Sequence, residues 1–161
     1  MLLLEQHPPH GQTAAEALKS RLNGIRLLVS PDLTEEDLSD DVIKDPVYVG
    51  AGELTALEKL KTTQAEFDNL NAGADQNKIT KTILLVQLLV AIRLISSFRQ
   101  ILSTSELQTT VRYEEIDWEK RIEFYQARAD GIADEILEDD DADALRSGSA
   151  IFGLVEHTTY F

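Results

Sequence analysis

The sequence predicts an all-α protein: a small helical bundle around a long central apolar helix, with a short extended arm and flexible termini. Apolar residues recur at spacings of three and four in most segments, and capping residues stand where those segments begin. One central run is apolar almost all round, as expected of a helix that its neighbours bury. The chain has 161 residues and no cysteine, which suits one domain with a single core and excludes disulfides.

We expect three parts: an N-terminal arm in residues 1–12, the helical bundle in residues 13–137, and an acidic and aromatic tail in residues 138–161. The arm, MLLLEQHPPHGQ, has no basic segment and is too short for a secretory signal, so a loose segment is expected. The bundle begins with a helix whose start carries a capping box, Thr13 and Glu16. The apolar face of this helix comprises Leu18, Leu22, Ile25 and Leu28.

The stretch DDVIKDPVYVGAGE predicts a second main helix, which begins at Pro46. Asp45 is placed to cap it, and a proline in the first helical position already has a helical φ angle and needs no donor. The apolar face of this helix is expected to comprise Val47, Ala51, Leu54 and Leu57. Gly50, Ala51 and Gly52 carry almost no side chain, so another element can approach closely there, either inside the domain or from another subunit.

Residues 61–77 mix polar and small side chains and are expected to form a loop. A long helix is predicted next, from about Gln76 to Leu102. Its run ILLVQLLVAIRLI is about thirteen residues long, against roughly 20 needed to cross a bilayer, and it contains Gln87 and Arg93. We therefore expect a buried core helix, the hub against which the others pack, and no membrane partner.

The last strong helix of the bundle is predicted from about Ile116 to Leu137. Its apolar residues fall at spacings of three and four, which places them in one seam that packs on the hub helix. This seam comprises Trp118, Ile122, Tyr125, Ala129, Ile132 and Ile136.

Two segments are predicted to reach other chains. Apolar and polar residues alternate in residues 105–114, which favours an extended arm whose backbone needs a partner, with Val111 and Tyr113 as candidate contact residues. The tail, after a Ser/Gly hinge, is expected to dock on a partner, because its apolar end would be poorly soluble if exposed. Its candidate contact residues are Ile151, Phe152, Leu154, Val155, Tyr160 and Phe161.

No arrangement of side chains points to an active site, a cofactor site or a metal site. Asp139, Asp141 and Asp143 have the spacing of the first ligands in a calcium loop, but Ala144 and Ala150 stand where that loop needs glycine and glutamate. The sequence also lacks the glycine-rich phosphate motifs and the nucleophile elbow. The histidines are expected in the arm and the tail; they are His7, His10 and His157. We predict a protein that is not an enzyme and uses no cofactor.

The formal net charge is -14, from 29 acidic and 15 basic side chains. Such a surface repels the phosphates of nucleic acids, and the basic residues form no cluster that would offset this. Specific binding of DNA or RNA is therefore not expected.

Two stretches resemble the head-tail adaptor proteins of tailed bacteriophages, also called connector or head completion proteins. LSDDVIKDPVYVGAGELTALEKL is similar to the family's acidic turn followed by D-P-x-x-x-G-A-A/G-E at a helix start. TVRYEEIDWEKRIEFYQARADGIADEIL is similar to the family's closing extended segment and helix. The resemblance covers roughly residues 32–137.

This resemblance implies a structural virion protein, made in the host cytoplasm and located at the head-tail interface. It implies a homo-oligomeric ring, commonly a dodecamer, that docks under the portal protein. The ring extends the DNA channel and offers a surface to the tail terminator, the stopper or another neck protein. DNA only passes through, and the net acidity of the chain fits a channel in which DNA slides without sticking.

Other interpretations stay open. An acidic DNA mimic or inhibitor would present carboxylates to a basic enzyme, although the acidic residues here gather in turns and the tail. A di-metal helical enzyme would need Glu-x-x-His pairs, which the sequence lacks. A helical adaptor of cellular origin would have a similar composition.

Overall fold

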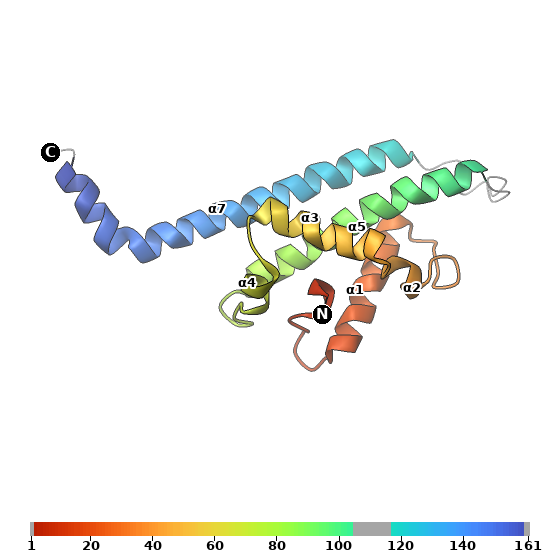
Figure 1. Cartoon of the computed structure of the whole chain (residues 1–161), viewed down its shortest axis with the longest axis horizontal. Helices are drawn as coiled ribbons and strands as arrows, with labels where there is room; N and C mark the ends of the chain where they lie inside the picture. The colour runs from red at the N-terminus through yellow and green to blue at the C-terminus, as the bar shows by residue number, and fades with distance from the viewer. Residues whose placement is uncertain (1, 105–116, 160–161) are drawn as a thin grey trace.

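A computed structural model describes the backbone of residues 2–104 and 117–159, and the side chains of residues 2–98 and 117–145. Every element within these ranges is helical, which confirms the all-α class (Figure 1). The elements are η1 (Leu3–Glu5), α1 (Ala14–Val29), α2 (Asp40–Ile43), the π turn η2 (Pro46–Gly50), α3 (Ala51–Leu60), α4 (Gln64–Asp68), α5 (Gln76–Thr104) and α7 (Trp118–Thr159).

Helix α5 is the hub of the bundle, as predicted. Helices α1, α3 and α7 pack against it, and α7 runs beside it in the opposite direction (Figure 1). The segment Gln76–Phe98 is long and apolar enough to cross a membrane, yet 61% of its most apolar window is buried inside the bundle. The buried residues of α5 include Ile79, Leu85, Val86, Leu88, Val90, Ala91, Leu94 and Ile95.

The predicted helix starts are confirmed at α1 and η2. The hydroxyl oxygen of Thr13 accepts a hydrogen bond from the backbone N–H of Glu16 at 3.2 Å. The carboxylate of Asp45 accepts one from the N–H of Val47 at 2.9 Å, and Pro46 opens the turn. These caps satisfy donors that the first turn of a helix leaves unpaired.

A buried arginine holds the acidic turn between α1 and α3 in place. The side chain of Arg26 is 4% exposed, and its Nε donates to the carbonyl oxygen of Leu38 at 2.7 Å. Its two terminal nitrogens donate to Asn23 Oδ1 and to Asp40 Oδ1, each at 2.5 Å. The guanidinium therefore ties the loop before α2, and the first residue of α2, to the end of α1.

The predicted apolar face of the second main helix is wrong at Val47 and Leu54, whereas Leu57 packs against the core and Ala51 is half-buried. Val47 and Leu54 are 64% and 60% exposed. Gly52 lies instead against α5, where an added Cβ would stand 2.5 Å from Val90 Cγ2 and 3.3 Å from Val90 N. At Gly52 the absence of a side chain therefore lets the two backbones approach, a contact that the periodicity of apolar residues does not select. The buried residues of η2 and α3 are Val49, Gly52, Glu53, Ala56 and Leu60.

Replacing Gly52 by alanine is expected to lower the free energy of unfolding by about 1–3 kcal/mol, because Val90 is too stiff to move without separating α3 from α5. Gly50→Ala is the matched control, since its added Cβ meets only Pro46 Cβ at an ordinary 3.5 Å. That variant should be neutral or more stable by up to about 1 kcal/mol. Urea denaturation of both variants checks this, and equal effects would contradict the close approach.

Two further segments differ from prediction. Residues 61–77 are not all loop, because they contain the short helix α4, which Thr63 caps. Phe67 of this helix is buried in the core. The last helix does not end at Leu137 but continues to Thr159. The helix can continue through the acidic stretch because Asp139 forms an ion pair with Lys81 of α5, and Asp140 forms one with Lys78. The glycines that follow do not stop it, since each costs a helix only about 1 kcal/mol. The predicted seam of α7 is confirmed: Ala129, Ile132 and Ile136 are buried, and Trp118, Ile122 and Tyr125 pack against the core.

Candidate interaction sites

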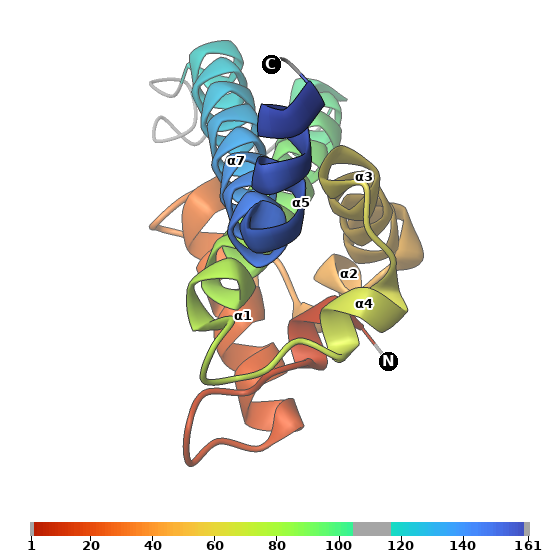
Figure 2. The same ribbon diagram turned by 90° about the vertical axis from the view of Figure 1, so that its left-hand side faces the viewer.

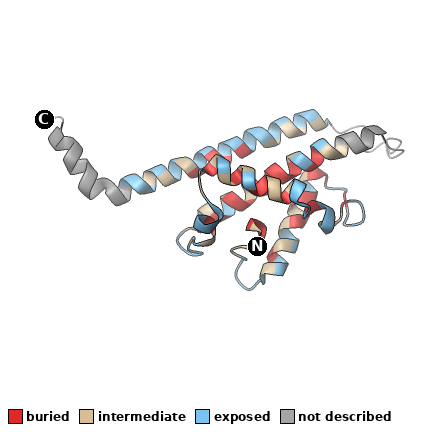
Figure 3. Ribbon diagram, in the orientation of Figure 1, coloured by how far each residue is buried: buried red, intermediate tan, exposed pale blue. Residues whose placement is uncertain are grey.

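Residues 2–7, called here the N-terminal segment, pack into the bundle. Leu3 and Leu4 are 1% and 0% exposed, and the segment contacts α1, α4 and α5 (Figures 2 and 3). The prediction of a loose arm is therefore wrong for these residues. The sequence of this segment is short and apolar and is followed by prolines. None of these features indicates that distant residues of the bundle bind it.

Polar contacts fix the main chain of the N-terminal segment. Arg21 of α1 donates to the carbonyl oxygens of Leu4 at 2.8 Å, Gln6 at 2.6 Å and His7 at 2.9 Å. The ring nitrogen Nε2 of His7 lies 2.7 Å from the carbonyl oxygen of Phe67, and since a carbonyl only accepts, this nitrogen carries the proton. The two rings also meet edge to face, with centroids 5.0 Å apart. His7 is thus part of a packed contact.

Glu53 of α3, one residue after Gly52, also contacts the N-terminal segment. Its carboxylate accepts a hydrogen bond from the backbone N–H of Leu3 and is 7% exposed. Burial raises the pKa of Glu53 to about 7; the N–H groups of Leu3 and Leu4 oppose this shift, and the nearby charge of Glu5 adds to it. The side chain that holds the segment therefore changes its charge near neutral pH. We name Arg21, Glu53 and Phe67 the receptacle.

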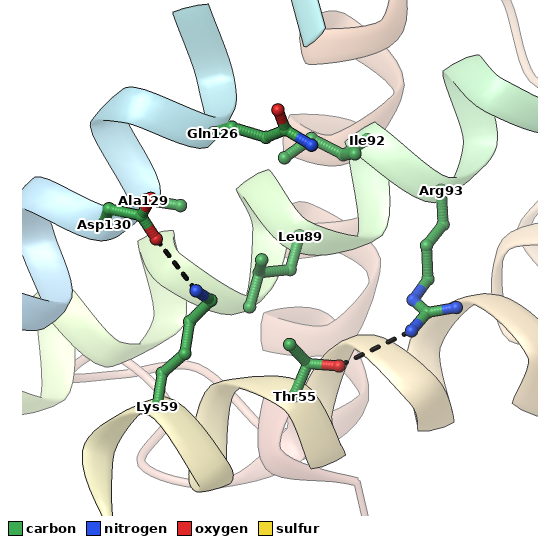
Figure 4. Close-up of a pocket in the computed structure, with 8 residues that line it drawn as sticks. All are labelled: Thr55, Lys59, Leu89, Ile92, Arg93, Gln126, Ala129 and Asp130. Carbon is green, nitrogen blue, oxygen red and sulfur yellow. Dashed lines mark hydrogen bonds and ion pairs between the residues drawn. The ribbon is translucent and has the colours of Figure 1, made fainter. Parts of the chain in front are cut away.

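A groove of about 360 Å³ lies between α3, α5 and α7 (Figure 4). Lys59 Nζ reaches Asp130 Oδ1 at 2.8 Å, while Arg93 makes a longer contact, 3.5 Å, to the hydroxyl of Thr55. The lining thus combines apolar side chains with two cations at the rim, which suits the docking of side chains from another molecule. The lining residues are Thr55, Lys59, Leu89, Ile92, Arg93, Gln126, Ala129 and Asp130.

An acidic hollow of about 310 Å³ lies between the start of α5 and α7. Lys78 reaches Asp140 at 3.0 Å, and Lys81 reaches both Glu135 and Asp139 at 3.3 Å. The hydrogen bonds that Lys81 donates to Asp139 and Glu135 raise the pKa of its ammonium group. Among the described residues, no group of three or more His, Asp or Glu side chains is arranged to hold a metal ion. The backbone here is helical, so the aspartate spacing does not form a calcium loop.

Of the predicted contact residues, the structure describes Gly50, Ala51 and Gly52 in full, and only the backbone of Ile151, Phe152, Leu154 and Val155. Gly50 and Ala51 are half-buried at the start of α3, whereas Gly52 serves the packing inside the domain. Figure 1 shows this end of α3 far from the C-terminal end of α7. The backbone of residues 151–155 belongs to that end, and the side chains of Ile151, Phe152, Leu154 and Val155 lie outside the described set. Val111, Tyr113, Tyr160 and Phe161, with the whole predicted extended arm, also lie outside the described residues.

Exposed apolar side chains mark the surfaces that the bundle leaves uncovered. Three of them follow one another on α2, η2 and α3: Val42, Val47 and Leu54, which are 45%, 64% and 60% exposed. Others lie on α1 and α7, namely Leu27, Phe124 and Leu145. We call Val42, Val47 and Leu54 together the α3 face; their exposure was not predicted, because the periodicity of apolar residues assigned Val47 and Leu54 to the core.

Comparison with known proteins identifies no relative from which a function could be transferred. No family model, no curated protein and no solved structure matches the chain.

Proposed function

We propose that the chain is a non-enzymatic structural protein that joins other components of an assembly, as a head-tail adaptor does in the neck of a tailed phage. In this proposal, copies form a ring under the portal protein, extend the DNA channel and offer a docking surface to the tail or the next neck protein. The resemblance in residues 32–137 supports it, and an all-α bundle is the fold that this resemblance implies.

The observation that carries the proposal is the length of α7 relative to the bundle. Ile136 is the last buried residue among its described side chains and Asp140 still pairs with α5, yet the helix continues to Thr159. Figure 1 shows this end projecting away from the other helices. None of the described side chains of α7 after Ile136, up to Leu145, is buried, so we propose that a partner supplies contacts to this part of the helix.

The α3 face gives a second reason to expect an assembly. Covering one large apolar side chain contributes about 1.5–3 kcal/mol, and Val47 and Leu54 are both more than half exposed. An adjacent subunit of a ring would bury them. The net charge of -14 also suits a channel through which DNA slides without sticking.

An acidic DNA mimic or inhibitor is the second candidate, because acidic residues follow one another along the exposed side of α7. Asp141 and Asp143 are exposed near the projecting end. However, Asp139 and Asp140 are paired with lysines of α5, which lowers the net negative charge that a basic partner would meet. This candidate also leaves the exposed α3 face without a role.

The test is the mass of the purified chain in solution, measured by light scattering, alone and mixed with its cognate portal ring. A ring-sized species, or a complex with the portal, would support the adaptor. A chain that stays monomeric and ignores the portal would contradict the adaptor and favour the acidic mimic.

Deleting residues 150–161 is expected to leave the bundle folded and to weaken portal binding about tenfold or more. The bundle should persist because the described core ends at Ile136, and the loss should be large because one buried apolar side chain already contributes more than tenfold. Thermal unfolding and portal titration check the two halves of this prediction. A full-length chain with residues 150–161 in shuffled order is the control, and unchanged binding by the truncated chain would contradict tail docking.

A further inference from the structure

We propose that the N-terminal segment is exchanged between copies of this chain, so that the receptacle of one copy holds residues 2–7 of another. The receptacle draws on three helices, with Arg21 from α1, Glu53 from α3 and Phe67 from α4. The receptacle therefore binds residues 2–7 themselves, and its contacts do not involve the residues that connect them to α1. The proposed occupant in an assembly is the same segment of a neighbouring subunit.

The contacts themselves do not depend on which chain supplies the segment. Arg21 donates to three carbonyl oxygens of the segment, and Glu53 accepts from one of its N–H groups. His7 donates to the carbonyl oxygen of Phe67, and two leucines fill the pocket. An identical segment from a second copy would make the same contacts, so the interaction energy is the same within one chain and between two chains.

The connection between the segment and α1 can straighten at little cost. All six residues from Pro8 to Thr13 are exposed, so straightening them gives up no buried side chain. Their turn is closed by one backbone hydrogen bond, from Gln12 N to Pro9 O at 2.9 Å. Two consecutive prolines favour an extended path, and residues 8–13 fully extended span at most about 20 Å. A released segment can therefore reach the receptacle of a close neighbour.

Concentration decides between the two arrangements. A short flexible connection keeps the segment at an effective concentration of about millimolar near its own receptacle, so dilute chains hold their own segments. In an assembly, or in a solution at about millimolar concentration, the segments of neighbouring chains reach a similar concentration near the same receptacle and compete with its own segment. Exchange needs only two copies of the chain, so it does not rest on the proposed role in a phage neck.

Crosslinking between two different single-cysteine chains tests the exchange, and the native chain has no cysteine to interfere. One chain carries Gln6→Cys in the segment, and the other carries Asn69→Cys, which is exposed and two residues from Phe67. The chains are mixed, unfolded, refolded together and treated with a flexible bismaleimide. The adduct of the two different chains should be rare at about 10 μM. Near 1 mM it should contain about a quarter of the Asn69→Cys chains, because about half of the receptacles are then exchanged and half of the exchanged segments come from the other variant.

Three controls make the outcome decisive. Gly131→Cys, at an exposed position of α7, replaces Asn69→Cys and should give no adduct, because Figure 1 shows α7 on the other side of α5 from the N-terminal segment. Leu4→Asp in the first chain should abolish the adduct, because it buries a charge in the pocket. A chain that carries both Gln6→Cys and Asn69→Cys should link to itself at every concentration.

A self-linking double-cysteine chain with no adduct between chains at 1 mM would overturn the exchange. A double-cysteine chain that does not link to itself would contradict the docked segment on which the exchange depends. Chains that exchange segments and ignore the portal ring would uphold this inference while contradicting the adaptor.

Discussion

Replacing Arg26 by alanine is expected to lower the free energy of unfolding by about 3–5 kcal/mol, the largest loss we expect from a single substitution. The change removes a cation that is 4% exposed, and it leaves the Leu38 carbonyl oxygen and the Asp40 carboxylate without their donor. For a chain of this length, each kcal/mol shifts the melting temperature by about 2–4 °C. Thermal and urea denaturation followed by circular dichroism should show this loss.

Lys19→Ala is the matched control on the same helix. It also removes a cation from an ion pair of α1, but the side chain of Lys19 is 63% exposed and lies 3.8 Å from Glu35. An exposed pair of this kind contributes about 1 kcal/mol or less. A loss for Arg26→Ala as small as that for Lys19→Ala would contradict the role of the buried guanidinium.

Replacing Glu53 by glutamine is expected to stabilise the protein at pH 8 and to remove part of its pH dependence. The pKa of Glu53 is about 7 in the folded chain and ordinarily about 4.5, so between these values the folded state holds a proton that the unfolded state releases. Stability from this group is therefore complete below about pH 4.5 and is lost as the pH rises towards 7. A shift of this size corresponds to roughly 3 kcal/mol.

Urea denaturation of the wild type and Glu53→Gln at pH 5, 6, 7 and 8 measures this effect as the difference between the two proteins. Glutamine is nearly isosteric and neutral, so its oxygen can still accept from the N–H of Leu3. Glu58→Gln, on the exposed side of α3, controls for the loss of one acidic residue. A difference for Glu53→Gln that does not grow between pH 5 and pH 8 would contradict the buried, proton-binding carboxylate.

The parts of the fold that local chemistry determines could be predicted from the sequence. The caps at Thr13 and Asp45 involve atoms only two or three residues apart, so their signal is contained in a short stretch. The hub role of α5 also follows from local composition, because a helix that is apolar on all sides must be covered on all sides.

The parts that depend on distant neighbours could not be predicted. The receptacle joins Glu53 to Leu3, 50 residues apart, and His7 to Phe67, 60 residues apart, and nothing near either residue indicates its partner. The face that α3 buries was missed for a different reason. Hydrophobic periodicity detects apolar side chains that recur on one face of a helix. It cannot detect the contact of Gly52 with Val90, which forms because Gly52 has no side chain.

Recognition of the N-terminal segment through its main chain has a consequence for mutational tolerance. Arg21 and Glu53 bind carbonyl and N–H groups that almost every amino acid presents, so codons 5 and 6 are free to drift. Only a proline at position 3 removes the N–H that Glu53 requires, while Arg21 has no equivalent substitute and Glu53 can be replaced only by glutamine. Selection for this contact would therefore leave its record in α1 and α3 and at Leu3, Leu4 and His7, and little at positions 5 and 6.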